Sequence, residues 1–294
     1  MIHLRLITAH HLGSVTHRSR ACCIAGLLLG LATPAPTLAQ VSTGMRVQDV
    51  GINAAIGLAT ATIWSVARGH GLAEGVRRGL VGGAITGIGR QIAASPFNGS
   101  GFAGREISAV GISLITSVGS EHLRLSFPVG PVELQVIDDR TFDWRINATD
   151  AIAAVINSAR KTTRLDIGLA LSSGTFVFRD RRGAFRVSGG EATASEFFQS
   201  ITLTKDAFHG STGVPNVLFH ENVHVLQDDY LANAVTNPIE QAILNRTQIG
   251  RRITRHIDLG VLSLPINVVA NSLIPYTSRP WEREAYALTQ RHNY

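Results

Sequence analysis

The chain between Val47 and Gly119 is rich in apolar and small residues and shows almost none of the alternation that marks β-strands. A pattern of this kind favours helices over sheet. We predict three helices in this part of the chain, over residues 47–68, 71–95 and 104–119.

The second of these helices carries a row of glycines at four-residue spacing: Gly71, Gly75, Gly79, Gly83 and Gly87. A glycine inside a helix costs roughly 0.5 to 1 kcal/mol relative to alanine, so the row needs a compensating contact. Glycine faces let another helix approach closely, in soluble hairpins as well as in membranes. We therefore expect a glycine-rich helical region over residues 40–120. Its helices in 47–119 form either a soluble hairpin or a module in peripheral contact with a membrane.

From Glu121 the apolar pattern changes to period two, which predicts strands. The predicted elements are a hairpin over 122–127 and 132–137, a strand over 142–146, a helix from Thr149 or Asp150 to Lys161, a second hairpin over 164–171 and 175–179, and a loop over 180–194. Residues 121–294 are therefore expected to form an α+β domain with a small antiparallel sheet.

The segment from Phe198 to Thr204 alternates apolar and hydroxyl side chains. This alternation predicts a half-exposed edge strand, to which an extended peptide can add through main-chain hydrogen bonds. Further along, residues 238–256 predict a helix with a solvated arginine face, and residues 257–274 predict a helix kinked at Pro265.

The segment His220-Glu221-Asn222-Val223-His224 places two imidazoles one helical turn apart, with a carboxylate next to the first. Residues i and i+4 of a helix have Cβ atoms roughly 5 to 6 Å apart, so both rings can reach one zinc ion. Glu221 is then the candidate general base, because it can accept a proton from a zinc-bound water whose pKa the metal lowers to about 7. Apolar residues on both sides of the motif predict a buried helix.

The residues around this motif exclude one class of zinc peptidase, and they resemble the sequence pattern of another class. A metzincin has the pattern HExxHxxGxxH, but Gln227 and Tyr230 stand at the glycine and third histidine positions. The segment Phe219–Gln227, together with Trp281-Glu282-Arg283-Glu284-Ala285-Tyr286 further along, resembles the gluzincin metallopeptidases, in particular their minimal forms. The resemblance covers only the C-terminal third of the chain.

The resemblance implies a zincin-like site on two helices, with Glu282 as the third zinc ligand beside His220 and His224. Helix geometry separately distinguishes Glu282 from Glu284, because residues two apart lie about 200° around a helix and only one of them can face the metal. Glu284 is then expected to be a rim charge or a partner of Arg291.

The chain departs from the gluzincin pattern at Tyr286, where that family has an aspartate that orients a ligating histidine. Partners of this kind change metal affinity by roughly 10- to 100-fold. A phenol is a weaker acceptor, so zinc binding is expected to be weaker than the ligands alone suggest. Tyr230, Tyr276 and Tyr286 are candidate oxyanion donors. Asp228 and Asp229 are either acceptors for the ligands or solvated.

The N-terminal residues have the pattern of an export signal. Its parts are a basic region with Arg5, Arg18 and Arg20, an apolar run over Ala21–Leu31, and Thr37-Leu38-Ala39 before Gln40 as a cleavage site. The apolar run is shorter than the about 20 residues that span a bilayer. We therefore predict that residues 1–39 are a cleaved signal peptide. The mature protein is expected to be exported, and to be periplasmic, outer-envelope-associated or secreted.

Composition excludes disulfide bonds and makes nucleic acid an unexpected partner. Cys22 and Cys23 both lie in the signal segment, so the mature chain has no cysteine and must be held together by packing. Three of the 27 basic residues also lie there, which leaves 24 against 21 acidic residues and a net charge of +3. Arginine outnumbers lysine 25 to 2, but no aromatic-interleaved basic stripe appears.

These observations predict an exported zinc metallopeptidase that hydrolyses peptide bonds through a zinc-activated water. Zn²⁺ is the expected cofactor, with His220, His224 and Glu282 as ligands and Glu221 as base, and a peptide or protein is the expected substrate. The alternative is a non-catalytic envelope or membrane-interaction protein with a structural or vestigial metal site. An open fourth position on the metal favours the enzyme, and a fourth protein ligand favours the alternative.

Overall fold

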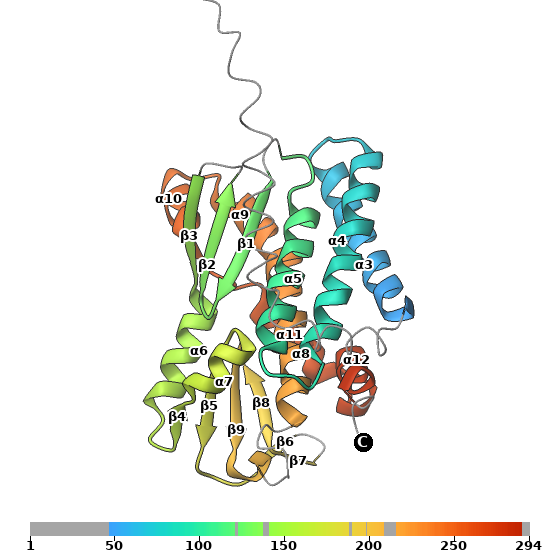
Figure 1. The fold of residues 1–294 in the computed structure, drawn as a ribbon. Coiled ribbons are helices and arrows are strands. Elements are labelled where there is room, and N and C mark those ends of the chain that lie inside the picture. Colours follow the sequence, from blue (N-terminus) through green and yellow to red (C-terminus); the bar gives the residue numbers. More distant parts are fainter. Residues whose placement is uncertain are drawn as a thin grey trace, which may run out of the picture. The chain divides into compact units, whose positions relative to one another are not determined.

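The computed structural model describes residues 47–120, 123–137, 141–187, 190–197, 199–208 and 216–289. These residues belong to one compact unit, Val41–Tyr294. The predicted signal peptide, residues 1–39, lies outside the described residues, as do His209, Arg291 and His292. Helices, two four-stranded sheets and a short hairpin make up the described part, so the predicted α+β class is confirmed (Figure 1).

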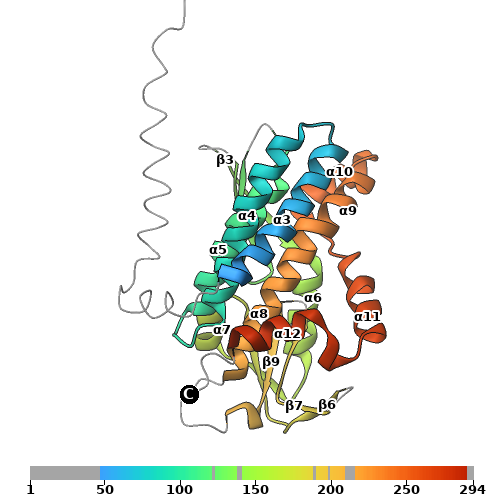
Figure 2. The same ribbon diagram turned by 90° about the vertical axis from the view of Figure 1, so that its right-hand side faces the viewer.

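Three helices at the start of the described chain lie side by side (Figures 1 and 2): α3 (Val47–Ala67), α4 (Leu72–Ala93) and α5 (Ser100–Thr116). All three predicted helices are present, and only the third is displaced, by about one turn, towards the N-terminus. The central helix of the three, α4, packs against both of the others.

Two rows of glycine make this close packing possible. The row facing α3 is Gly75, Gly79, Gly83 and Gly87, and the row facing α5 is Gly82 and Gly89. A methyl group added at Gly79 would lie 2.6 Å from the carbonyl oxygen of Gly57, which is too close for any side chain. The predicted helix contact is therefore confirmed for four of the five glycines. Gly71 precedes α4 and has open space around it.

The outer side of α3 is apolar and exposed. Ile52, Ile56, Ile63 and Val66 each keep at least 45 % of their surface accessible. Within the part of the chain that the structure describes, α3 is the one helix long and apolar enough to cross a membrane, judged by length and composition. Contact between these helices and a membrane stays a prediction.

The first sheet has the strand order β1-β2-β3-β10. Its strands are β1 (Arg124–Val129), β2 (Val132–Ile137), β3 (Thr141–Asn147) and β10 (Ile257–Asp258). The first three are antiparallel and include the predicted hairpin, whereas β10 pairs with β3 in parallel. The next helix, α6 (Ala148–Ala159), begins earlier than predicted because Asn147 caps it, accepting a hydrogen bond from the Asp150 N–H at 3.2 Å.

The second sheet has the strand order β4-β5-β9-β8. Its strands are β4 (Thr163–Leu165), β5 (Phe176–Asp180), β9 (Ser200–Thr204) and β8 (Ala194–Phe197). The antiparallel pairing of β4 with β5 agrees with the predicted second hairpin, but β5 and β9 are parallel. Each sheet is therefore mixed, where an antiparallel sheet was expected.

The connection between β4 and β5 is a helix, α7 (Ile167–Ser173), and not the predicted continuation of the strand. Asp166 caps α7 by accepting a hydrogen bond from the Leu169 N–H at 3.1 Å, and Gly174, with φ +69°, ends it. The predicted loop over 180–194 likewise contains the short hairpin of β6 (Phe185–Val187) and β7 (Gly190–Ala192).

The strand nearest in sequence to the histidine motif, β9, is an interior strand, so the predicted edge strand is wrong. All five of its residues are buried. Two of the three hydroxyl groups that suggested exposure are paired inside the protein: Ser200 Oγ accepts from Asn157 Nδ2 at 3.0 Å, and Thr204 Oγ1 donates to the Thr193 carbonyl at 2.9 Å. The edge strand of this sheet is β8.

The C-terminal part is helical, and its first helix, α8, carries the two histidines. The elements are α8 (Asn216–Tyr230), a π-helical segment (Leu231–Thr236), α9 (Asn237–Leu244), α10 (Gln248–His256), α11 (Ser263–Leu273), a 3₁₀ turn (Tyr276–Ser278) and α12 (Pro280–Thr289). The predicted helix over 238–256 is two helices, because Thr247 caps α10. The predicted helix over 257–274 begins only at Ser263, so Pro265 lies in a first turn, where a missing N–H is tolerated.

Apolar packing fixes α8 and α12 against their neighbours. On one side of α8, Leu218 and Leu226 belong to a core that includes Val177 and Leu203 of the second sheet. On the α12 side, Val223 packs with Ala285, which is fully buried. The helix α12 therefore lies against α8 near the end of α4 (Figure 2).

Candidate metal centre

Two helices bring three predicted ligands together. His220 and His224 lie on one face of α8, and Glu282 lies in the first turn of α12. The His220 Nε2 and His224 Nε2 atoms are 3.0 Å apart, and Glu282 Oε2 lies 3.4 Å and 3.3 Å from them. All three donor atoms lie within 4.8 Å of one another.

This triangle of donor atoms has the size that a zinc ion requires. Zinc bonds to nitrogen and oxygen are about 2.0 to 2.2 Å long, so adjacent ligands of a tetrahedral ion lie roughly 3.3 Å apart. Glu282 Oε2 is buried and faces both rings, yet no hydrogen bond of acceptable geometry reaches it among the described residues. An orphaned acceptor beside two imidazole nitrogens fits a cation, because buried polar groups are otherwise almost always hydrogen-bonded. The residues therefore fit zinc.

The electrostatics of the metal-free site point to the same need for positive charge. Burial lowers the pKa of His224, but Glu282 and Glu221 more than offset this effect and raise it to about 9. Burial raises the pKa of Glu282, but the facing histidines pull it well below its usual range. The carboxylates around His224 therefore favour positive charge at this position. A bound cation would supply that charge.

Glu221, the predicted general base, is buried beside the three donors, with only 6 % of its surface exposed. Burial raises its pKa, whereas the charges of His224 and His220 lower it. The backbone N–H of Glu196, in edge strand β8, donates a hydrogen bond to its carboxylate. This carboxylate is thus held in place from the neighbouring sheet, as a general base requires.

Two of the three candidate oxyanion donors lie at the site. The Tyr286 ring lies against His220, with ring centroids 4.5 Å apart, and its hydroxyl oxygen is 3.5 Å from that of Tyr276. Tyr230 is engaged elsewhere, because its hydroxyl donates to Thr60 Oγ1 of α3 at 2.9 Å. The structure therefore leaves Tyr276 and Tyr286 as candidates.

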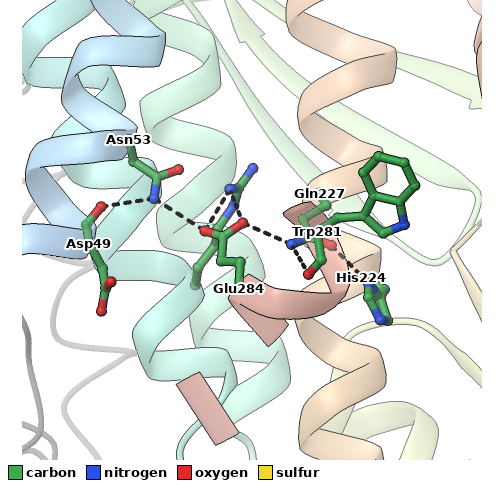
Figure 3. Close-up of polar contacts among 7 residues, drawn as sticks. Asp49, Asn53, His224, Gln227, Trp281 and Glu284 are labelled. Carbon is green, nitrogen blue, oxygen red and sulfur yellow. Dashed lines mark hydrogen bonds and ion pairs between the residues drawn. The ribbon is translucent and has the colours of Figure 1, made fainter. Parts of the chain in front are cut away.

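A chain of hydrogen bonds leads away from His224 (Figure 3). His224 Nδ1 is 2.8 Å from Gln227 Oε1, and Gln227 Nε2 donates to Glu284 Oε2 at 2.8 Å and to the Trp281 carbonyl at 3.1 Å. Arg90 Nη1 of α4 then donates to both carboxylate oxygens of Glu284 at 3.0 Å. The chain connects α8 and α12 to the glycine-rich helices.

Glu284 therefore has a different role from the one predicted. It forms an ion pair with Arg90 and receives a weaker hydrogen bond from Asn53 Nδ2 of α3 at 3.4 Å, so the interpretation as a rim charge is wrong. Burial raises the pKa of Glu284, but Arg90 and Gln227 lower it below its usual value. Arg291, the other predicted partner, lies outside the described residues.

The two aspartates after the motif are neither solvated nor bonded to a motif histidine among the described contacts. Asp229 is buried and forms an ion pair with Arg105 of α5 at 2.9 Å. Asp228 Oδ1 accepts from Asn267 Nδ2 of α11 at 3.3 Å, and burial raises the pKa of Asp228 to about 6. Both tie α8 to neighbouring helices.

Sequence reasoning missed Arg90 and Asn53, which lie far from the motif along the chain. Gln227 is visible in the motif itself, but only the fold shows that it contacts His224. No local pattern links a basic residue on a glycine-rich helix to a glutamate near the C-terminus. His256 of α10 stacks on Trp144 of β3, with ring centroids 4.9 Å apart.

A cavity of about 440 Å³ is separate from the candidate metal centre. Residues of α5, the first sheet and α9 line it, and Arg145, Asp150 and Asp229 are among its walls. None of the three predicted ligands lines this cavity.

No family model matches the chain, and no curated protein or solved structure matches it either. The resemblance to gluzincins therefore rests on the motif residues, and the function has to be argued from the site itself.

Proposed function

We propose that the protein is an exported zinc metallopeptidase that hydrolyses peptide bonds in a peptide or protein substrate. The observation that carries the proposal is the convergence of His220, His224 and Glu282 beside the buried carboxylate of Glu221. Among the described residues, this group of donors contains no fourth histidine, cysteine or carboxylate ligand. Three protein ligands leave zinc an open position, which is typical of catalytic sites.

The residues of the chain then have separate roles. His220, His224 and Glu282 would hold the zinc ion, which would supply a Lewis acid that lowers the pKa of a water at the site to about 7. Glu221 would accept a proton from the water that attacks the peptide carbonyl, and it would deliver this proton to the amine that leaves when the C–N bond breaks. Tyr276 and Tyr286 offer phenolic O–H groups to the oxyanion that develops on the substrate carbonyl.

Metal analysis of the mature chain tests this proposal most directly. We expect bound zinc, and we expect hydrolysis of a fluorescently labelled unfolded protein that stops on chelation and returns with added zinc. Glu221→Gln keeps the size of the side chain but removes the proton acceptor, so it should retain zinc and lose roughly 100- to 10,000-fold in activity. Equal hydrolysis by the wild type, this variant and the chelated protein would contradict the proposal.

A second candidate function is supported by α3. Its exposed apolar side, with Ile52, Ile56 and Ile63, suits a non-catalytic envelope or membrane-interaction protein with a structural or vestigial metal site. Flotation of the mature protein with anionic vesicles, combined with the zinc and activity measurements, separates the two candidates. Vesicle binding without hydrolysis supports the second candidate, and hydrolysis without vesicle binding supports the first.

A further inference from the structure

The hydrogen-bonded chain from His224 to Arg90 has a defined order of donors and acceptors. A side-chain amide has an oxygen end that accepts and an NH₂ end that donates. Around Gln227, the Glu284 carboxylate and the Trp281 carbonyl both lie within hydrogen-bond distance of one end, and both can only accept. That end of Gln227 must therefore be the NH₂ group.

The orientation of Gln227 then determines where the proton of His224 sits. The oxygen of Gln227 is the end that faces His224 Nδ1 at 2.8 Å, so Nδ1 must carry the hydrogen. A neutral imidazole with hydrogen on Nδ1 has its lone pair on Nε2. Nε2 is the atom that lies 3.0 Å from His220 Nε2 and 3.3 Å from Glu282 Oε2, at the candidate metal position.

Glu284 is held as an acceptor from the other side. Arg90 donates from Nη1 to both of its oxygens, and a guanidinium has no acceptor atom. Only 7 % of the Arg90 side-chain surface is accessible, so water competes little for this contact. Arg90 can only donate hydrogen bonds, so it sets the order of donors and acceptors along the whole chain of contacts from Glu284 to His224.

We propose that Glu284 and Gln227 are positioning residues for the metal site, which fix His224 as the tautomer that presents Nε2 to zinc. Arg90 of α4 and Asn53 of α3 hold Glu284 in place, so the glycine-rich helices take part in preparing the site. The inference rests on the proposed function only in that zinc is the ligand. It assigns Gln227 and Glu284 no contact with the metal or with substrate.

Zinc affinity, measured by competition with a chromophoric chelator, tests the proposal. In Glu284→Gln, the negative charge is lost and one oxygen becomes an NH₂ group that faces the Arg90 donor in either orientation, so the contact that holds Gln227 is weakened. We expect the zinc Kd to rise roughly 10- to 100-fold, the effect of removing a partner of a metal ligand. Glu74→Gln is the matched control, because it removes the same charge from the Glu74–Arg78 pair on the surface of α4. Its zinc Kd should not change.

A double variant separates positioning from a general loss of structure. Gln227→Leu removes the acceptor of His224 Nδ1, so Glu284 can no longer act on that ring. Adding Glu284→Gln to Gln227→Leu should therefore change the zinc Kd little further, because both residues act through one chain of contacts. Additive effects of the two substitutions on zinc binding would overturn the proposal, as would an unchanged Kd in Glu284→Gln.

The wild type alone provides a second test, which does not depend on the folding of any variant. ¹⁵N-resolved NMR of the zinc-loaded protein distinguishes a metal-bound ring nitrogen from a protonated one. We expect His224 to carry hydrogen on Nδ1 and metal on Nε2, and the reverse assignment would overturn the proposal. A wild type that binds no zinc contradicts the proposed function instead, so the two failures are distinguishable.

Discussion

Glu282 and Glu284 lie two residues apart on α12, and their carboxylates face in different directions. Glu282 faces the histidines of α8, while Glu284 faces Arg90 of α4. Helix geometry alone predicted that the two would diverge, because residues two apart lie about 200° around a helix. The geometry could not predict the partner of Glu284, since Arg90 is 194 positions away in sequence and only the fold brings it close.

Replacing Glu282 tests its assignment as a ligand. Glu282→Gln removes the charge and the best donor atom, so zinc affinity should fall by more than the roughly 100-fold expected for the loss of a supporting partner. Isothermal titration of the metal-free chain with zinc would measure this change. A smaller loss of affinity in Glu282→Gln than in Glu284→Gln would reverse the two roles.

Asp258 of β10 makes stability depend on pH. Its side chain is buried and accepts a hydrogen bond from Asn237, and burial raises its pKa to about 7. The folded state therefore keeps a proton that the unfolded chain loses above about pH 4, so unfolding is favoured as pH rises from about 4 to about 7. This group alone should cost stability on the order of a few kcal/mol across that window.

Asp258→Asn should remove this part of the pH dependence. Urea unfolding of the metal-free chain at pH 5 and at pH 7.5 measures the effect, and the variant should lose less stability between these pH values than the wild type. Asp180 provides a control that should not contribute between these pH values, because a hydrogen bond from Arg182 lowers its pKa and the stability it contributes is lost only as pH falls below about 4. Parallel profiles for Asp258→Asn and the wild type would contradict the prediction.

At the scale of elements, the contact between α3 and α4 is made by backbone atoms. A methyl group at Gly83 would overlap the carbonyl oxygen of Asn53 and lie 2.8 Å from the Ala54 Cα. Neither of these atoms can rotate away, so the helices themselves would have to separate. The glycine row is therefore an essential part of the helix interface.

Gly83→Ala should destabilise the protein, although alanine favours helix formation. We expect the free energy of unfolding to fall by about 1 to 3 kcal/mol, the usual cost of overpacking. Gly51→Ala is the matched control in α3, because a methyl group there meets nothing within 4 Å. It should raise stability by about 0.4 to 1 kcal/mol. Equal effects of the two substitutions in thermal unfolding would contradict this account of the interface.

The elements that the sequence predicted well are those with strong local signals. The three glycine-rich helices, the first hairpin and the histidine helix all depend on periodicity within one segment. The errors arose where tertiary pairing decided the outcome. Alternating hydroxyl groups suggested an exposed edge for β9, but Ser200 is paired with Asn157 of α6 and Thr204 with the Thr193 carbonyl inside the protein. Similarly, the cap at Asp166 turned part of a predicted strand into α7.

At the scale of the whole molecule, the candidate metal site depends on distant parts of the chain. His220 and His224 come from α8, Glu282 comes from α12, and Arg90 supports them from α4 (Figures 2 and 3). The sequence indicated the two histidines because their spacing is local, and it indicated Glu282 through the resemblance to the gluzincin motif. The supporting contacts could not be predicted, because they depend on how the two regions pack together.

Export of the protein can be tested independently of the metal site. Leu27→Asp combined with Leu28→Asp interrupts the apolar run of the predicted signal peptide, so the precursor should stay inside the cell. Leu171→Asp combined with Leu273→Asp is the matched control, because both side chains are more than 70 % exposed in the described structure. Export of this control should be normal.

Mass spectrometry of the exported wild type should show a mature N-terminus at Gln40. An exported protein that retains residues 1–39 would mean that the segment is an anchor and not a cleaved signal.

The wide sequence separation between the motif histidines and Glu282 has a consequence for the timing of activity. A ribosome adds roughly 5 to 20 residues per second, so Glu282 is made several seconds after His224. Throughout that interval the nascent chain lacks its third metal ligand and the helix that carries it. On the proposed function, the peptidase cannot become active until nearly all of this sequence has been synthesised. On that proposal, the histidine motif alone is inactive, and activity begins only when α12 packs against α8.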